Sequence, residues 1–305
     1  MASFEKLIDH NKRLSVLLFL LLMLLLGFLG AAVGILWGGN WYTGIPVALA
    51  VGAIYFFISW SFGDSMILSM NHARETQHED APQLWNVVEE LAIAGGLPMP
   101  KVFLIEDQAM NAFATGRDPQ HASVAITRGL MEKLNREELQ GVMAHEMSHV
   151  RNYDIRFAML MAVMVGSIVL ICDILRRSLF FGSMGRRRNS SSGAGKGQVI
   201  LAIAALVLSI LAPLFAAIIQ LAVSRQREYL ADASAVELTR NPKGLISALR
   251  KLSESQEKLR GASRGTQHLY IVNPFKKQGR DSLFSTHPSL ESRIARIEGI
   301  ATAQA

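Results

Sequence analysis

The chain has 305 residues, of which 50% are hydrophobic and 18% are charged, and its formal net charge is +6. Ordinary soluble domains carry about 25% charged residues, so this composition favours a membrane protein and excludes global disorder. The one cysteine, Cys172, excludes an internal disulfide and a zinc site built from cysteines. The arginines cluster beside apolar runs, which is typical of membrane proteins, so we predict no nucleic-acid partner. Any metal must be held by His, Asp or Glu.

The N-terminal part of the chain contains no charged residue from Leu14 to Gly63. Two apolar runs, Leu14–Trp37 and Gly44–Trp60, flank a Gly-Gly-Asn turn, and each is near the length of about 20 residues that a membrane-spanning helix needs. A cleaved signal peptide is the alternative, but its apolar region is about 7 to 15 residues long and no second run follows it directly. We therefore predict a transmembrane hairpin over residues 1–63.

A second apolar hairpin is predicted over residues 156–224. Val199–Ser224 is long enough to span a bilayer, whereas Phe157–Cys172 is short enough to be a span, a re-entrant segment or a buried core helix. Between these runs, residues 176–198 are rich in Arg, Ser and Gly and bury too little apolar surface to fold, which predicts a flexible loop.

The remaining segments, 64–155 and 225–305, are expected to form two parts of one catalytic domain. They must lie on the same side of the membrane, because either two crossings or none separate them. Apolar periodicity predicts a mainly α fold with a small β-sheet. The expected helices are Ala81–Gly95, Pro242–Leu259 and Pro288–Ile300, and the expected strands are Lys101–Glu106, Asn111–Thr115 and Ser123–Thr127.

The orientation in the membrane follows from positive charges at the ends of the apolar runs. Arginines and lysines flank the runs on both sides in nearly equal number, including an arginine-rich group in residues 176–198. The first helix carries the most weight in the positive-inside rule, and the turn after it has no charge. We therefore place the N-terminus and the catalytic domain in the cytosol.

The sequence His145-Glu146-Met147-Ser148-His149 indicates a metal site. Residues four apart lie on one face of a helix, so both imidazoles can bind one ion while Glu146 projects beside them. Asn135 and Glu138 resemble a capping box that starts this helix. The alternative is that these are ordinary helix residues, but the motif interrupts an apolar helix side, where unpaired polar groups are costly to bury.

A catalytic zinc needs three protein ligands and an open position. The extended motif HExxHxxGxxH is absent, because Asn152 and Ile155 stand where its Gly and third His would be. The best third ligand is Glu228, and Asp232, four residues later on the same helix face, can accept the second N–H of a ligand imidazole. We expect one Zn²⁺ per chain, held by His145, His149 and Glu228.

These motifs together resemble a known family. Two N-terminal spans, HExxH, a membrane hairpin, Glu228-Tyr-Leu-Ala-Asp232 and Ser285-Thr-His-Pro-Ser289 closely resemble the HtpX-type membrane zinc endopeptidases, relatives of the CaaX prenyl proteases. The resemblance covers essentially the whole chain. It implies multi-pass membrane helices with a gluzincin-like α+β peptidase domain facing the cytoplasm, in a bacterial inner membrane. It also implies polypeptide substrates drawn from misfolded or damaged membrane proteins, in contact with the lipid bilayer.

The resemblance also implies roles for individual residues. Glu146 would be the catalytic base and His287 a second donor to the oxyanion, with Arg293 as the weaker candidate; otherwise His287 is a surface residue that caps a helix. The strand Asn111–Thr115 would pair with an extended substrate, which makes Asn111 a candidate for substrate binding.

Two other functions remain open at this point. One is a prenyl-peptide processing protease with the same chemistry on a narrower substrate, and the other is a zinc-binding membrane adaptor without peptidase activity. A metal transporter is disfavoured, because the four apolar runs carry no ionisable residue at mid-span. The sequence does not predict an oligomeric state.

Overall fold

The computed structural model describes residues 2–36, 40–158, 168–174, 176–177, 196–255, 257, 259, 269–272 and 288–304. The chain divides into two compact units, Met1–Ser61 with Leu160–Gln220, and Phe62–Met159 with Leu221–Ala305. The fold is mostly helical with one small mixed sheet, as predicted. Most of the run Phe157–Cys172 and of the predicted loop 176–198 lies outside the described residues.

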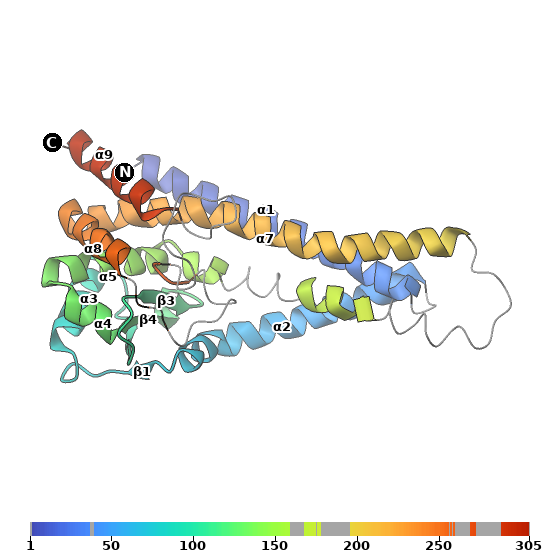
Figure 1. Cartoon of the computed structure of the whole chain (residues 1–305), viewed down its shortest axis with the longest axis horizontal. Coiled ribbons are helices and arrows are strands. Elements are labelled where there is room, and N and C mark those ends of the chain that lie inside the picture. Colours follow the sequence, from blue (N-terminus) through green and yellow to red (C-terminus); the bar gives the residue numbers. More distant parts are fainter. Residues whose placement is uncertain are drawn as a thin grey trace. The chain divides into compact units, whose positions relative to one another are not determined.

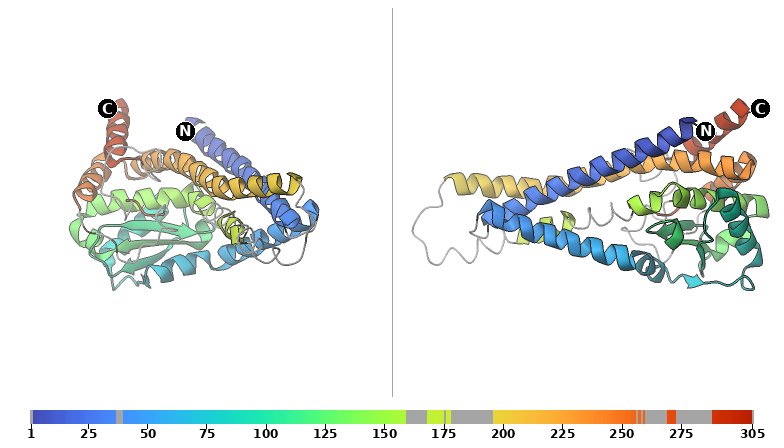
Figure 2. Two further views of the ribbon diagram at one scale, coloured as in Figure 1. Left: turned by 45° about the vertical axis from the view of Figure 1, so that its right-hand side comes forward. Right: turned by 180° about the vertical axis from the view of Figure 1, so that it is seen from behind.

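Long apolar helices make up the described part of the first unit. The predicted runs lie in α1 (Ala2–Leu36), in α2 (Trp41–Met70) and in α7 (Lys196–Thr239), which continues into the second unit without a break (Figure 2). Among the described residues, only Trp41–Ile58 is both long and apolar enough to cross a membrane, and Met23–Ile35 forms a shorter apolar segment. The helical character of these runs is confirmed, and a multi-pass arrangement stays a prediction.

Three glycines bring α1 and α2 into close contact. A Cβ atom on Gly44 would lie 1.9 Å from the carbonyl oxygen of Gly30 and 2.6 Å from the nitrogen of Gly34. Small residues four apart let two helix backbones approach in this way, and they are common where helices pack inside membranes.

The second unit contains a four-stranded sheet. Its strands are β1 (Arg74–Glu75), β2 (Lys101–Ile105), β3 (Ala112–Gly116) and β4 (Ala122–Thr127), in the order β1-β2-β4-β3. β2 and β4 run parallel, and β3 pairs antiparallel with β4 at one edge. The three predicted strands are confirmed to within a residue at each end, whereas β1 is too short to show alternation.

The helix α5 (Arg136–Arg151), which carries the HExxH sequence, packs between this sheet and other helices. Figure 1 shows α3 (Pro82–Gly95), α5 and α8 (Pro242–Glu254) beside the sheet. Their apolar side chains share one core with alternate strand residues such as Val124. The other residues of the strands, such as Phe113, form a second cluster with Tyr270. Both faces of the sheet are therefore buried.

Three helical details differ from the prediction. α8 ends at Glu254 rather than at Leu259, because Ser255 is extended. α9 (Leu290–Gln304) begins two residues after Pro288, and the short helix α4 (Arg128–Lys133) was not predicted.

The predicted capping box at the start of α5 is confirmed: the side chain of Asn135 accepts from the Glu138 amide, and the Glu138 carboxylate accepts from the Asn135 amide.

Buried Glu138 also fastens α5 to α8, through Ser247 at 2.7 Å and Lys251 at 2.6 Å. One turn before His145, Gly141 lets the two backbones come close: a Cβ there would lie 2.7 Å from the nitrogen and 2.8 Å from the Cα of Leu245. These contacts hold the part of α5 that carries the HExxH motif against α8.

We expect Gly141→Ala to lower the free energy of unfolding by about 1–3 kcal/mol, because the backbone of α8 must move. Gly299→Ala is the matched control, since nothing lies within 4 Å of a Cβ at Gly299. The control should gain up to about 1 kcal/mol from helix propensity. Thermal or denaturant unfolding of the purified protein measures both changes, and equal stabilisation of the two variants would contradict the close packing.

Candidate metal centre

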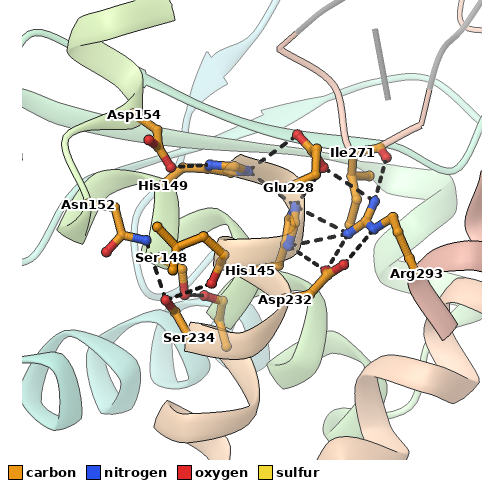
Figure 3. A network of polar contacts seen from close by, with 12 residues as sticks. His145, Ser148, His149, Asn152, Asp154, Glu228, Asp232, Ser234, Ile271 and Arg293 are labelled. Carbon is orange, nitrogen blue, oxygen red and sulfur yellow. Dashed lines mark hydrogen bonds and ion pairs between the residues drawn. The ribbon is translucent and has the colours of Figure 1, made fainter. Parts of the chain in front are cut away.

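Three side chains converge between α5 and α7 (Figure 3). His145 and His149 stand one turn apart on α5, with their Nε2 atoms 3.2 Å from one another. The carboxylate of Glu228, on α7, lies 3.5 Å from His145 Nε2 and 3.7 Å from His149 Nε2. One ligand atom from each residue lies within 4.8 Å of the other two. The structure therefore brings together the three residues that the sequence predicts as ligands.

The protons on the two imidazoles follow from their neighbours. His145 Nδ1 lies 3.0 Å from Asp232, and His149 Nδ1 lies 3.0 Å from Asp154. A carboxylate accepts hydrogen bonds, so Nδ1 is the nitrogen that keeps its proton and Nε2 is the nitrogen that can offer a lone pair to a metal ion. The two Nε2 atoms lie 3.2 Å apart beside a carboxylate, an arrangement that favours a cation among them. Ligand atoms on a tetrahedral zinc are about 3.3 Å apart, so this spacing fits zinc.

The buried charges around the ligands also fit a divalent cation. Glu146, Asp154, Glu228 and Asp232 are each at most 7% exposed, and so are Arg227 and Arg293. Among the described residues, these four carboxyl groups outnumber the two guanidinium groups. An excess of buried acidic groups is costly without compensation, and a divalent cation among the imidazoles would offset it.

Glu146 follows the ligand His145 on α5 and has a buried carboxylate. It is 1% exposed, and neither of its oxygens has a hydrogen-bond partner in the described part of the chain. Burial raises the pKa of Glu146 above its usual range, and the adjacent histidines oppose the rise. Buried carboxylates are normally hydrogen-bonded, so both oxygens of this one keep their capacity to accept a proton or a hydrogen bond.

Arg293 is fully buried next to the ligands and does not reach the surface. Its guanidinium donates to both oxygens of Asp232, at 2.9 and 2.7 Å, and one nitrogen lies 3.5 Å from Glu228. Burial and Arg293 disfavour the charged form of His145, but hydrogen bonds to Asp232 and Glu228 outweigh them and raise its pKa to about 9. Burial alone would raise the pKa of Asp232, but Arg293 and His145 lower it. This environment keeps Asp232 ionised next to the first ligand.

The corresponding neighbours of His149 were not predicted from the sequence. Asp154 contacts His149 Nδ1, and its other oxygen accepts from Arg227 at 3.1 Å. Tyr153, with φ of 60°, turns the chain after α5 so that Asp154 comes back toward the helix. The only sign of this contact in the sequence is that Asp154 follows HExxH closely. Whether its side chain reaches His149 depends on the turn at Tyr153.

Two further predicted residues have different outcomes. Both groups of the Asn111 amide are used inside the protein, because Nδ2 donates to the Val272 carbonyl and Oδ1 accepts from the Ala112 amide. The carbonyl of Ala112, at the outer edge of β3, accepts from the amide of Ile271 at 3.0 Å. His287 lies outside the described residues.

Comparison with known proteins agrees with this geometry. Residues 78–301 match the model of the family described as Peptidase family M48. The chain belongs to this family. A protein named Protease HtpX homolog from Lactobacillus acidophilus is 48% identical over 292 residues, which cover 95% of this chain and 98% of that protein. A protein of the same name from Listeria monocytogenes serotype 4a is 46% identical over 299 residues, covering 96% and 98%.

A solved structure is also similar. The crystal structure of S. mikatae Ste24p aligns with a TM-score of 0.48 and 22% identity, over 83% of this chain and 63% of that chain.

As a member of the M48 family, the chain is a metallopeptidase that uses zinc and cleaves polypeptides. The charge and the spacing of the described donors fit that ion. His145, His149 and Glu228 are the residues that would hold it.

Replacing the third ligand should release zinc. We expect Glu228→Ala to weaken zinc binding at least about 100-fold, because two imidazoles alone leave the ion incompletely held. Glu237→Ala is the matched control, since Glu237 lies on the same helix and pairs with Arg151. Zinc content per chain after competition with a chelator measures the effect. Equal zinc retention in both variants would remove Glu228 from the ligand set.

Proposed function

We propose that the chain is a membrane-embedded zinc endopeptidase that degrades misfolded or damaged membrane proteins, with Glu146 as its general base. The observation that supports it most is the convergence of two imidazole nitrogens and the Glu228 carboxylate beside the carboxylate of Glu146, which has no hydrogen-bond partner among the described residues. The quality-control role rests on the resemblance to HtpX-type peptidases and agrees with the names of the relatives.

The proposed chemistry assigns distinct tasks to the residues of the site. When bound, zinc supplies positive charge that polarises a peptide carbonyl and makes water more acidic. Glu146 takes the proton of the attacking water and then delivers it to the departing amide nitrogen. His145, His149 and Glu228 hold the ion, and Asp232 fixes the ring of His145. His287 stays a candidate for the second donor to the oxyanion, on the family resemblance alone.

The substrate is proposed to pair with the outer edge of β3. Main-chain groups of a strand alternate between its two sides, so those of Ala114 face the same way as those of Ala112. Among the described residues, Ile271 pairs with this edge at the carbonyl of Ala112, and the extended peptide is proposed to pair with the part toward Gly116. Asn111 then shapes this edge by holding Val272, instead of contacting the substrate itself.

The proposed topology places the first unit in the bilayer and the second in the cytoplasm. The unit boundaries near Ser61, Met159 and Gln220 lie close to the predicted division into 1–63, 64–155, 156–224 and 225–305, which supports the proposal. A bacterial inner membrane is the proposed location, and lipid would cover the exposed apolar side chains of α2 such as Ile54 and Phe57.

The general base can be tested by Glu146→Gln. We expect this variant to bind about one zinc per chain and to cleave casein at least about 100-fold more slowly than the native protein, because no carboxylate is left to accept the proton. The control is Glu137→Gln, an exposed position on the same helix. Cleavage is measured with purified protein in detergent with zinc.

Equal cleavage by the Glu146 and Glu137 variants would exclude Glu146 as the base. Membership of the M48 family argues against the non-catalytic adaptor. The same assay addresses the remaining alternative, because a CaaX-type protease would cleave a prenylated peptide but not casein.

The crossing of the third apolar run can be tested by labelling. A cysteine introduced at Ser191 should react with a membrane-impermeant reagent added outside intact cells, because one crossing places residues 176–198 on the outer side. A cysteine at Ser263, in the proposed cytoplasmic part, is the control and should react only after lysis. Protection of both positions would show that the run does not cross.

A further inference from the structure

A series of buried polar contacts connects His149 to the ends of the apolar hairpin. His149 Nδ1 lies 3.0 Å from Asp154, whose second oxygen accepts from Arg227 at 3.1 Å. Asp154 is 7% exposed and Arg227 is 6% exposed. Burial lowers the pKa of Arg227 to about 10, and Asp154 opposes this decrease, so the guanidinium stays charged at neutral pH.

The arrangement at His149 repeats the one at His145. Each ligand imidazole faces an aspartate with its Nδ1, and each aspartate is paired with a buried arginine, Asp232 with Arg293 and Asp154 with Arg227. An aspartate in this place fixes the tautomer and the ring orientation, and it makes the ligand more basic. The arginine is needed in turn, because an unpaired buried carboxylate is costly.

Arg227 is itself positioned by an aromatic ring. Its guanidinium carbon lies 3.3 Å from the centre of the Phe157 ring. Phe157 is the first residue of one apolar run, and Arg227 comes three residues after Ser224, the last residue of the other. Both belong to the second compact unit. The residues that support His149 therefore lie at the two ends of the apolar hairpin, where the chain leaves the catalytic domain and where it returns.

We propose that Asp154 and Arg227 are positioning residues that orient His149 for zinc, and that the contact of Arg227 with Phe157 ties the metal centre to the two ends of the apolar hairpin. The inference rests on the proposed metal site. A displacement of either end of the hairpin, for example by a substrate in the membrane, would then change the orientation of His149 and with it the affinity for zinc.

The competing explanation is a buried ion pair that contributes only to folding. A double variant separates the two explanations. In Asp154→Asn with Arg227→Met, no unpaired buried charge remains, and the asparagine oxygen still accepts from His149 Nδ1 but carries no charge. A structural pair replaced in this way leaves zinc binding unchanged, whereas a positioning pair does not.

The experiment compares Asp154→Asn, Arg227→Met and the double variant with Arg250→Met, in which an exposed arginine paired with Glu298 is removed. The thermal midpoint of the zinc-free protein, zinc affinity by chelator competition and the visible absorption of the cobalt-substituted protein are measured. We expect Arg227→Met to lower the midpoint and the double variant to recover it. Zinc affinity should stay about 10- to 100-fold below that of the native protein in both Asn-containing variants, with an altered cobalt spectrum.

Native zinc affinity and a native cobalt spectrum in the double variant would overturn the proposal, even if cleavage were impaired. These readouts do not depend on cleavage, so failure of the proposed peptidase function, as tested with Glu146→Gln, is distinguishable from failure of this inference. For variants that retain activity, kcat should fall while KM changes little, because Asp154 and Arg227 are proposed to act through His149.

Discussion

The structure of the site depends on three lone-pair donors that face one another inside the protein. The Nε2 atoms of His145 and His149 lie 3.2 Å apart and share their space with the Glu228 carboxylate. The buried carboxyl groups around them outnumber the buried guanidinium groups, so a cation among these donors is favoured. The neighbouring residues make the cluster suitable for zinc: an aspartate contacts the Nδ1 atom of each imidazole and so leaves Nε2 for the ion, and each aspartate is paired with a buried arginine.

The fold serves this cluster by holding two helices rigidly. The capping box at Asn135, the ion pair of Glu138 with Lys251 and the close approach at Gly141 fix α5 against the sheet and α8. α7 brings Glu228 and Asp232 to the other side, and α9 contributes Arg293. Since a displacement of about 1 Å is enough to disturb a zinc site, this rigidity is a functional requirement.

The edge of the sheet is connected to the metal centre through Arg293. Ile271 pairs with Ala112, and Arg293 donates to the carbonyl of Ile271 while it holds Asp232. One arginine thus joins the support of the first ligand to the segment that closes part of the edge of β3. The other arginine, Arg227, joins the support of the second ligand to the ends of the apolar hairpin. Both ligand supports therefore end outside the metal centre, one beside β3 and the other at the ends of the apolar hairpin.

Local patterns in the sequence determined the helices, three strands and the His145–His149 pair, because period and spacing are properties of neighbouring residues. Glu228 and Asp232 were also predicted, since they share a helix face. Only the tertiary structure decided the rest. Asp154 reaches His149 through a left-handed turn at Tyr153, Arg227 meets Asp154 across two elements, and the side chains of Asn111 and Arg293 turn inward. Such contacts depend on how distant elements pack, and local periodicity carries no information about that packing.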